Sequence, residues 1–87
     1  MFHVVWLQTA LDELAAIWTA ADSPVRQAIT AATHAIDQEL QRDPHQGESR
    51  PGGSRVFFVH PLGIQFRVAE DSSTVRVFHV WDIRRHK

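Results

Sequence analysis

The spacing of apolar residues changes once along this chain, and that change restricts the folds that the chain can adopt. Between residues 7 and 42, apolar side chains recur every three or four residues, which is the period of an amphipathic helix. Between residues 55 and 81, apolar and polar side chains alternate, which is the period of a strand with one covered face. We therefore expect helices from the first half to pack on a sheet from the second half.

The first half contains two predicted helices joined by a short break. The first helix has an apolar stripe that ends at Trp18, and we expect this tryptophan to lie in the core. The second helix begins after the break ADSP, where Ser23 is a suitable N-cap. It should end at Asp43, because the residue before a proline is pushed out of the helical region. So short a turn predicts an antiparallel helix hairpin.

One short strand is predicted before the helices, and three are predicted after a loop rich in glycine and proline. The first strand is FHVVW (2–6), the loop covers 43–54, and the later strands are RVFFVH (55–60), IQFRVAE (64–70) and TVRVFHVW (74–81). Tight turns between the last three predict an antiparallel meander. The expected fold is therefore α+β, with the order β-α-α-β-β-β and the helix hairpin packed on one face of an antiparallel sheet.

Length and composition exclude several classes of protein. Eighty-seven residues predict a single domain, residues 1–87. The chain has no cysteine, so it can form neither a disulfide nor a thiolate zinc site. No H-E-x-x-H motif is present, and we expect no metal and no cofactor. The absence of a long apolar run predicts no membrane span, and a cytoplasmic location is expected.

Positive charge is concentrated in the second half of the chain. Residues 1–50 carry three basic and seven acidic side chains, a net charge of −4, whereas residues 51–87 carry six basic and three acidic ones, a net charge of +3. A meander places its strands side by side, so we expect Arg55, Arg67 and Arg84 to form one cluster at the open sheet face. Guanidinium groups there could bind phosphate or carboxylate groups.

Five further side chains extend this predicted cluster. His79 is the candidate proton acceptor, because imidazole exchanges protons at about pH 7. Regular alternation along the last strand places Arg76 and His79 on opposite faces of the sheet. Trp81 either covers the core or stacks on a base or on a partner's side chain. Arg85 and His86 complete the candidate binding residues, and His86 is the alternative proton acceptor.

The ordered series of segments resembles the RelE/ParE superfamily of toxins from bacterial type II toxin–antitoxin systems. The resemblance rests on ALDELAAIW, on a second helix ending AIDQELQRDP, on the loop with its glycines, and on SRVFFV, IQFRV and VRVFHVWDIRR. Arg55 matches a basic position of RelE-like toxins. The segment VWDIRR is similar to their Val-x-His-x-Arg-Arg ending, in which Arg84 matches the first arginine. Phe57 and Asp82 differ from the basic residue and the histidine of that pattern.

The resemblance implies an antitoxin partner and two alternative targets. RelE-like members are metal-independent ribonucleases that cut mRNA on the ribosome, and Arg55, Arg67, His79 and Arg84 would be the catalytic residues of such an enzyme. ParE-like members inhibit DNA gyrase instead. The sequence leaves open a third alternative, an inactive homologue that binds another protein. We expect the antitoxin to cover apolar and basic surface of the second half.

Overall fold

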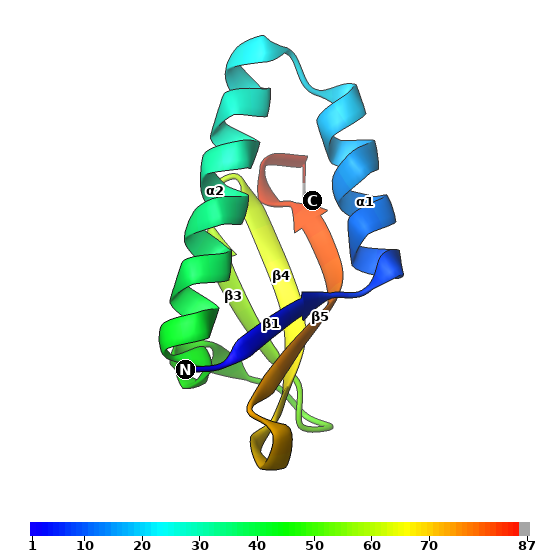
Figure 1. Ribbon diagram of the computed structural model, residues 1–87. Coiled ribbons are helices and arrows are strands. Elements are labelled where there is room, and N and C mark those ends of the chain that lie inside the picture. The colour runs from blue at the N-terminus through cyan, green and yellow to red at the C-terminus, as the bar shows by residue number, and fades with distance from the viewer. Residues whose placement is uncertain (86–87) are drawn as a thin grey trace.

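The computed structural model describes residues 1–85, and its elements follow the predicted order with one added strand. The elements are β1 (His3–Trp6), α1 (Gln8–Ala20), α2 (Ser23–Arg42), β2 (Glu48–Ser49), β3 (Arg55–Val59), β4 (Leu62–Ala69) and β5 (Thr74–Asp82). The strands form one sheet in the order β1-β5-β4-β3-β2. Figure 1 shows the hairpin of α1 and α2 with α2 in front of the sheet and α1 beside β5, while β1 crosses toward α1.

The sheet is mixed, so the prediction of an antiparallel sheet is correct only for its later strands. Strands β3, β4 and β5 form the predicted antiparallel meander, and β2 adds antiparallel to β3 within the expected loop. Strand β1 pairs in parallel with β5, with Val4 opposite Val75 and Trp6 opposite Val77. The helix hairpin reverses the chain once and the turn between β2 and β3 reverses it again, and the meander adds two more reversals. The last strand therefore returns beside the first one in the same direction.

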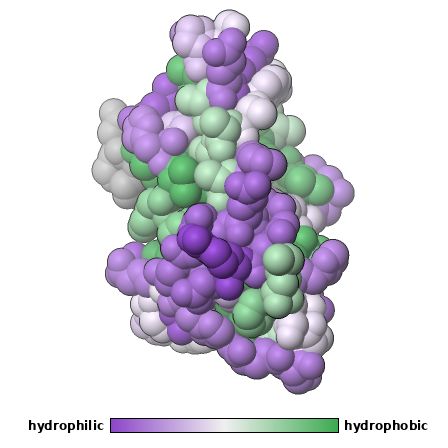
Figure 2. All heavy atoms as spheres, turned by 60° about the vertical axis from the view of Figure 1, so that its left-hand side comes forward, coloured by the Kyte–Doolittle hydropathy of each residue, from purple (hydrophilic) through white to green (hydrophobic). Residues whose placement is uncertain are grey.

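Helix α2 supplies the helical half of the core. Its stripe of Ile29, Ala32, Ile36 and Leu40 is buried, and it packs with buried residues of β4 and β5 in one cluster. Its first turn is capped by Asp22, which accepts a hydrogen bond from the Val25 N–H at 3.2 Å. The cap is thus one residue earlier than Ser23. On the side of the molecule that carries α2, hydrophilic side chains cover most of the surface and apolar groups form separate patches (Figure 2).

Helix α1 lies along the outer edge of β5 instead of lying over the sheet. Strand β1 pairs with β5 only as far as Val77, and the Leu7 N–H donates to the Val77 carbonyl at 2.9 Å. Beyond that point, the Thr9 hydroxyl donates to the Phe78 carbonyl at 3.1 Å. The Glu13 carboxylate accepts the Val80 N–H at 2.9 Å. Side chains of α1 therefore replace a neighbouring strand at this part of the β5 edge.

This edge position corrects the prediction that Trp18 lies in the core. Ala10 is the one buried residue of α1, and Leu14 and Ile17 are partly buried against the core. Trp18 is 40% exposed and Leu11 is 42% exposed. A helix at the edge of a sheet contacts the sheet through only a narrow strip of its own surface. Most of the apolar stripe of α1 therefore stays at the surface of the molecule.

A β-bulge in β5 changes which side chains share a face of the sheet. Gln65 pairs with His79 and Phe66 pairs with Val77, which leaves Phe78 as the extra residue. The pairing of Arg67 with Arg76 continues beyond the bulge. Residues that pair directly point to the same face, so Arg76 and His79 lie on one face. The prediction that they lie on opposite faces is wrong, because the bulge adds one residue between them.

Within residues 1–85, no helix has the length and apolar character needed to cross a bilayer.

Candidate functional site

Arg55 points to the helix side of the sheet. Its direct partner on β4 is Phe66, which is buried in the core beneath α2. The guanidinium donates to the carbonyl groups of His45 at 3.2 Å and Gly47 at 2.8 Å. Arg55 therefore ties the segment after α2 to the start of β3.

Arg84 also lies away from the open face. It follows β5 in a 3₁₀ turn, Ile83–Arg85, and its Nη2 lies 2.8 Å from Oδ2 of Asp82. Its Nε and its backbone N–H both donate to Oδ1 of the same carboxylate, at 3.1 and 3.0 Å. These hydrogen bonds to Asp82 raise the pKa of Arg84 above its ordinary value. The pair borders a small pocket that includes Ile17 of α1.

Arg67 lies on the opposite, open face of the sheet, beside Arg76. Its guanidinium donates to the Gly52 carbonyl at 2.6 Å and lies 5.7 Å from the centre of the Phe78 ring. Arg76 is its direct cross-strand neighbour, and both side chains are exposed. These two arginines make one half of the open sheet face positively charged.

The predicted cluster of Arg55, Arg67 and Arg84 is not formed. Arg67 is on the open face, whereas Arg55 and the Asp82–Arg84 pair are on the helix side at opposite ends of the sheet. The partners of Arg55 and Asp82 on β4 are Phe66 and Leu62, four residues apart, which corresponds to roughly 13 Å along a strand. Sequence reasoning failed here because the direction of each side chain depends on register. The side chain of Arg85 and the whole of His86 lie outside the described residues.

The other half of the open face carries an aromatic platform, defined here as Phe58, His79 and Trp81. The Phe58 and Trp81 ring centres are 5.9 Å apart in an edge-to-face arrangement, and those of His79 and Trp81 are 5.2 Å apart. Gly63 is the direct partner of Trp81, and a Cβ atom at position 63 would lie 2.6 Å from Cε2 of the indole. The indole therefore lies against the β4 backbone, which holds the platform in one place.

His79 is fixed by a residue that sequence reasoning missed. Its Nδ1 lies 2.9 Å from Oε1 and 2.7 Å from Oε2 of Glu13, the same carboxylate that accepts the Val80 N–H. Glu13 lies 66 residues away in the chain, so no local motif could have indicated this pair. The contact orients the imidazole and joins the platform to α1.

A cleft of about 820 Å³ opens beside the platform. It is lined by Arg50, Pro51, Val56, Phe58, Gln65, Trp81 and Ile83. Phe58 lies at the border of the cleft and is 46% exposed. The Gln65 side chain, which also lines the cleft, is held in place because it donates a hydrogen bond to the buried Ser54 hydroxyl at 2.8 Å. The lining can accept an apolar or aromatic group beside one cation. Among residues 1–85, no group of three or more histidine, cysteine and acidic side chains could hold a metal ion.

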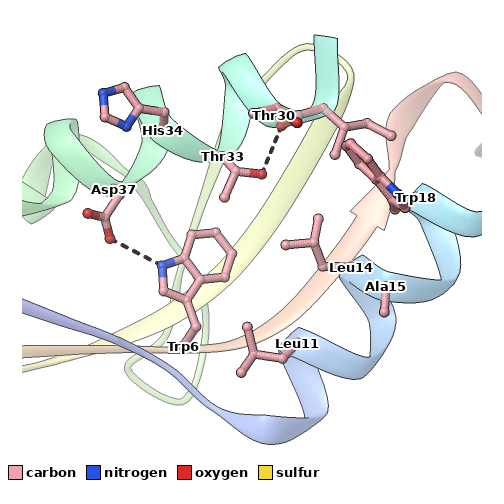
Figure 3. A pocket seen from close by; sticks show the side chains of 10 residues that line it. Trp6, Leu11, Leu14, Ala15, Trp18, Thr30, Thr33, His34 and Asp37 are labelled. Carbon is pink, nitrogen blue, oxygen red and sulfur yellow. Dashed lines mark hydrogen bonds between the residues drawn. The ribbon is translucent and has the colours of Figure 1, made fainter. Parts of the chain in front are cut away.

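A second apolar surface lies between the two helices, as a groove of about 700 Å³ (Figure 3). It is lined by Trp6, Leu11, Leu14, Ala15, Trp18, Ile29, Thr30, Thr33, His34 and Asp37. The Trp6 indole donates to Asp37 at 3.2 Å, which fixes the ring between α1 and α2. Sequence reasoning missed this groove because both helical stripes were expected to be covered.

Comparison with known proteins connects this fold to toxin–antitoxin systems. Residues 4–86 match the family model described as ParE toxin of type II toxin–antitoxin system, parDE. A comparison with curated sequences finds no significant match.

Solved structures of proteins from toxin–antitoxin systems have a similar fold. A chain of the RelBE2 toxin–antitoxin complex from Mycobacterium tuberculosis gives a TM-score of 0.75 at 19% identity, covering 93% of this chain and 96% of that one. A chain of the chromosomal ParDE system from P. aeruginosa gives 0.71 at 20% identity, covering 95% and 97%. The isolated RelE toxin from E. coli gives 0.64 at 16% identity, covering 100% and 89%.

Proposed function

Because the chain belongs to the ParE toxin family of type II toxin–antitoxin systems, we propose that it arrests growth by binding and inhibiting DNA gyrase and that it does not cut RNA. The observation that carries this proposal is the separation of the four candidate catalytic residues. Arg55 and Arg84 lie on the helix side of the sheet, whereas Arg67 and His79 lie on the open face.

The chemistry of RNA cleavage explains why that separation matters. Attack of a 2′-hydroxyl on the adjacent phosphate requires a proton acceptor and cations around one phosphate group. Arg55 donates to two backbone carbonyls, Arg84 binds Asp82, and His79 contacts Glu13. A surface that binds a protein needs no such convergence, and the apolar and cationic cleft beside Trp81 suits that role.

The inter-helix groove supports an antitoxin partner. Leu11 and Trp18 are each about two-fifths exposed on its walls. An exposed apolar groove of this kind commonly binds a partner segment. We place an apolar helix of the antitoxin there, with a cation facing Asp37. This position is on the first half of the chain, whereas the sequence had suggested the second.

The test measures gyrase inhibition and cleavage of ribosome-bound mRNA by the purified chain after its antitoxin has been removed. We expect loss of DNA supercoiling by gyrase, recovery of supercoiling when the antitoxin is restored, and intact mRNA on translating ribosomes. Cleavage of ribosome-bound mRNA that disappears in His79→Ala would overturn the proposal in favour of the ribonuclease. A chain that affects neither assay and does not slow growth would correspond to the inactive homologue.

A further inference from the structure

The outer edge of β3 is open over three residues. Strand β2 pairs only with Arg55 and Val56, and in the described part of the chain no strand pairs with the outer side of Phe57–Val59. Proteins usually protect such an edge with a charge, a proline or a covering loop. Phe57, Phe58 and Val59 provide neither a charge nor a proline.

The exposed edge adjoins the cleft on the open face. Phe58 belongs to both, because its backbone is on the edge while its ring borders the cleft and contacts Trp81. Strand addition uses this combination: backbone hydrogen bonds along the edge provide affinity, and a neighbouring pocket for an alternate side chain provides specificity.

Charge around the cleft favours an acidic segment. Arg50 lines the cleft and forms an exposed ion pair with Glu48 at 3.2 Å. Arg67 and Arg76 add positive charge farther along the same face. A nucleic acid fits less well, because the whole chain has a net charge of −1.

We propose that the β3 edge and its cleft bind an extended segment of the toxin's target protein. The segment adds as a strand beside Phe57–Val59, inserts an apolar or aromatic side chain against Phe58 and Trp81, and directs a carboxylate at Arg50. This inference rests on the proposed function, because it assigns the target to a surface separate from the inter-helix groove.

The experiment uses two matched substitutions in the full chain. Phe58→Lys places a cation at the edge and cleft, and Leu11→Lys places the same cation in the inter-helix groove, at similar exposures of 46% and 42%. We expect Phe58→Lys to weaken growth arrest and gyrase inhibition by about tenfold or more while the antitoxin still co-purifies. Leu11→Lys should weaken binding of the antitoxin by a similar factor, while growth arrest and gyrase inhibition are retained. Phe58→Thr, which keeps a strand-forming residue without the ring, should also weaken arrest and retain the fold.

The outcomes separate this inference from the proposed function. An unaltered chain without growth arrest or gyrase inhibition would overturn the proposed function, whatever the variants do. An active unaltered chain with equally active, folded Phe58 variants would overturn the inference alone. Loss of both gyrase inhibition and antitoxin binding in a folded Phe58→Lys chain would also overturn it, since the target and the antitoxin would then share one surface. Tight binding of a short single-stranded RNA by the unaltered chain, lost in both Phe58 variants, would identify a nucleic acid as the occupant and overturn it as well.

Discussion

Helices α1 and α2 have similar apolar stripes in the sequence but different environments in the structure. Helix α2 buries four residues of its stripe, whereas α1 fully buries only Ala10. The difference arises from position, because α2 faces the sheet and α1 lies along the β5 edge. An amphipathic stripe therefore predicts a helix reliably, but burial depends on what lies opposite. On α1, the part left exposed becomes a wall of the inter-helix groove.

The largest effect on stability should come from the buried stripe of α2. Ile36 is fully buried, so Ile36→Ala should lower the free energy of unfolding by about 2–5 kcal/mol. Gln38→Ala, at an exposed position of the same helix, should change it by no more than about 0.5 kcal/mol. Urea unfolding of both variants measures the contrast. Equal losses would mean that α2 does not present this stripe to the core.

Much of the fold could be predicted from periodicity, because the period of side chains depends on local geometry. The extent of α2, the meander of β3, β4 and β5, and the buried Ile64 and Phe66 were all predictable in this way. The parallel pairing of β1 and the bulge at Phe78 depend on contacts between distant segments. No local pattern determines them.

The candidate site was less predictable than the fold, because a site depends on which face each side chain occupies. The single extra residue at Phe78 moves His79 to the face of Arg76. Register places Arg55 beneath α2, opposite Phe66. Sequence reasoning identified Trp81 as a candidate, but its support by Gly63 became visible only through the pairing of β4 with β5.

A smaller effect should follow from removing the carboxylate that attaches α1 to the sheet edge. Glu13→Ala leaves the Val80 N–H without its acceptor and should cost about 1–2 kcal/mol of unfolding free energy. Glu13→Gln retains an oxygen that can accept this bond, so its cost should be about half of that or less. Thermal unfolding of the two variants measures the difference. If both are as stable as the unaltered chain, packing alone holds α1 beside β5.

A smaller effect than that of Glu13→Ala should come from Trp18→Ala in the free chain, although a core tryptophan would cost about 3–5 kcal/mol. Trp18 is 40% exposed, and Arg26 lies 5.6 Å from its ring centre, so its removal should cost about 1 kcal/mol or less. The affinity for the antitoxin should nevertheless fall by about tenfold or more, because an exposed tryptophan in an apolar groove is a typical binding hot spot. Unfolding of the free chain and titration with purified antitoxin separate these two quantities. A large loss of stability would place Trp18 in the core and make α1 resemble α2. Unchanged affinity in a stable variant would place the antitoxin elsewhere and leave the exposed stripe of α1 without an assigned partner.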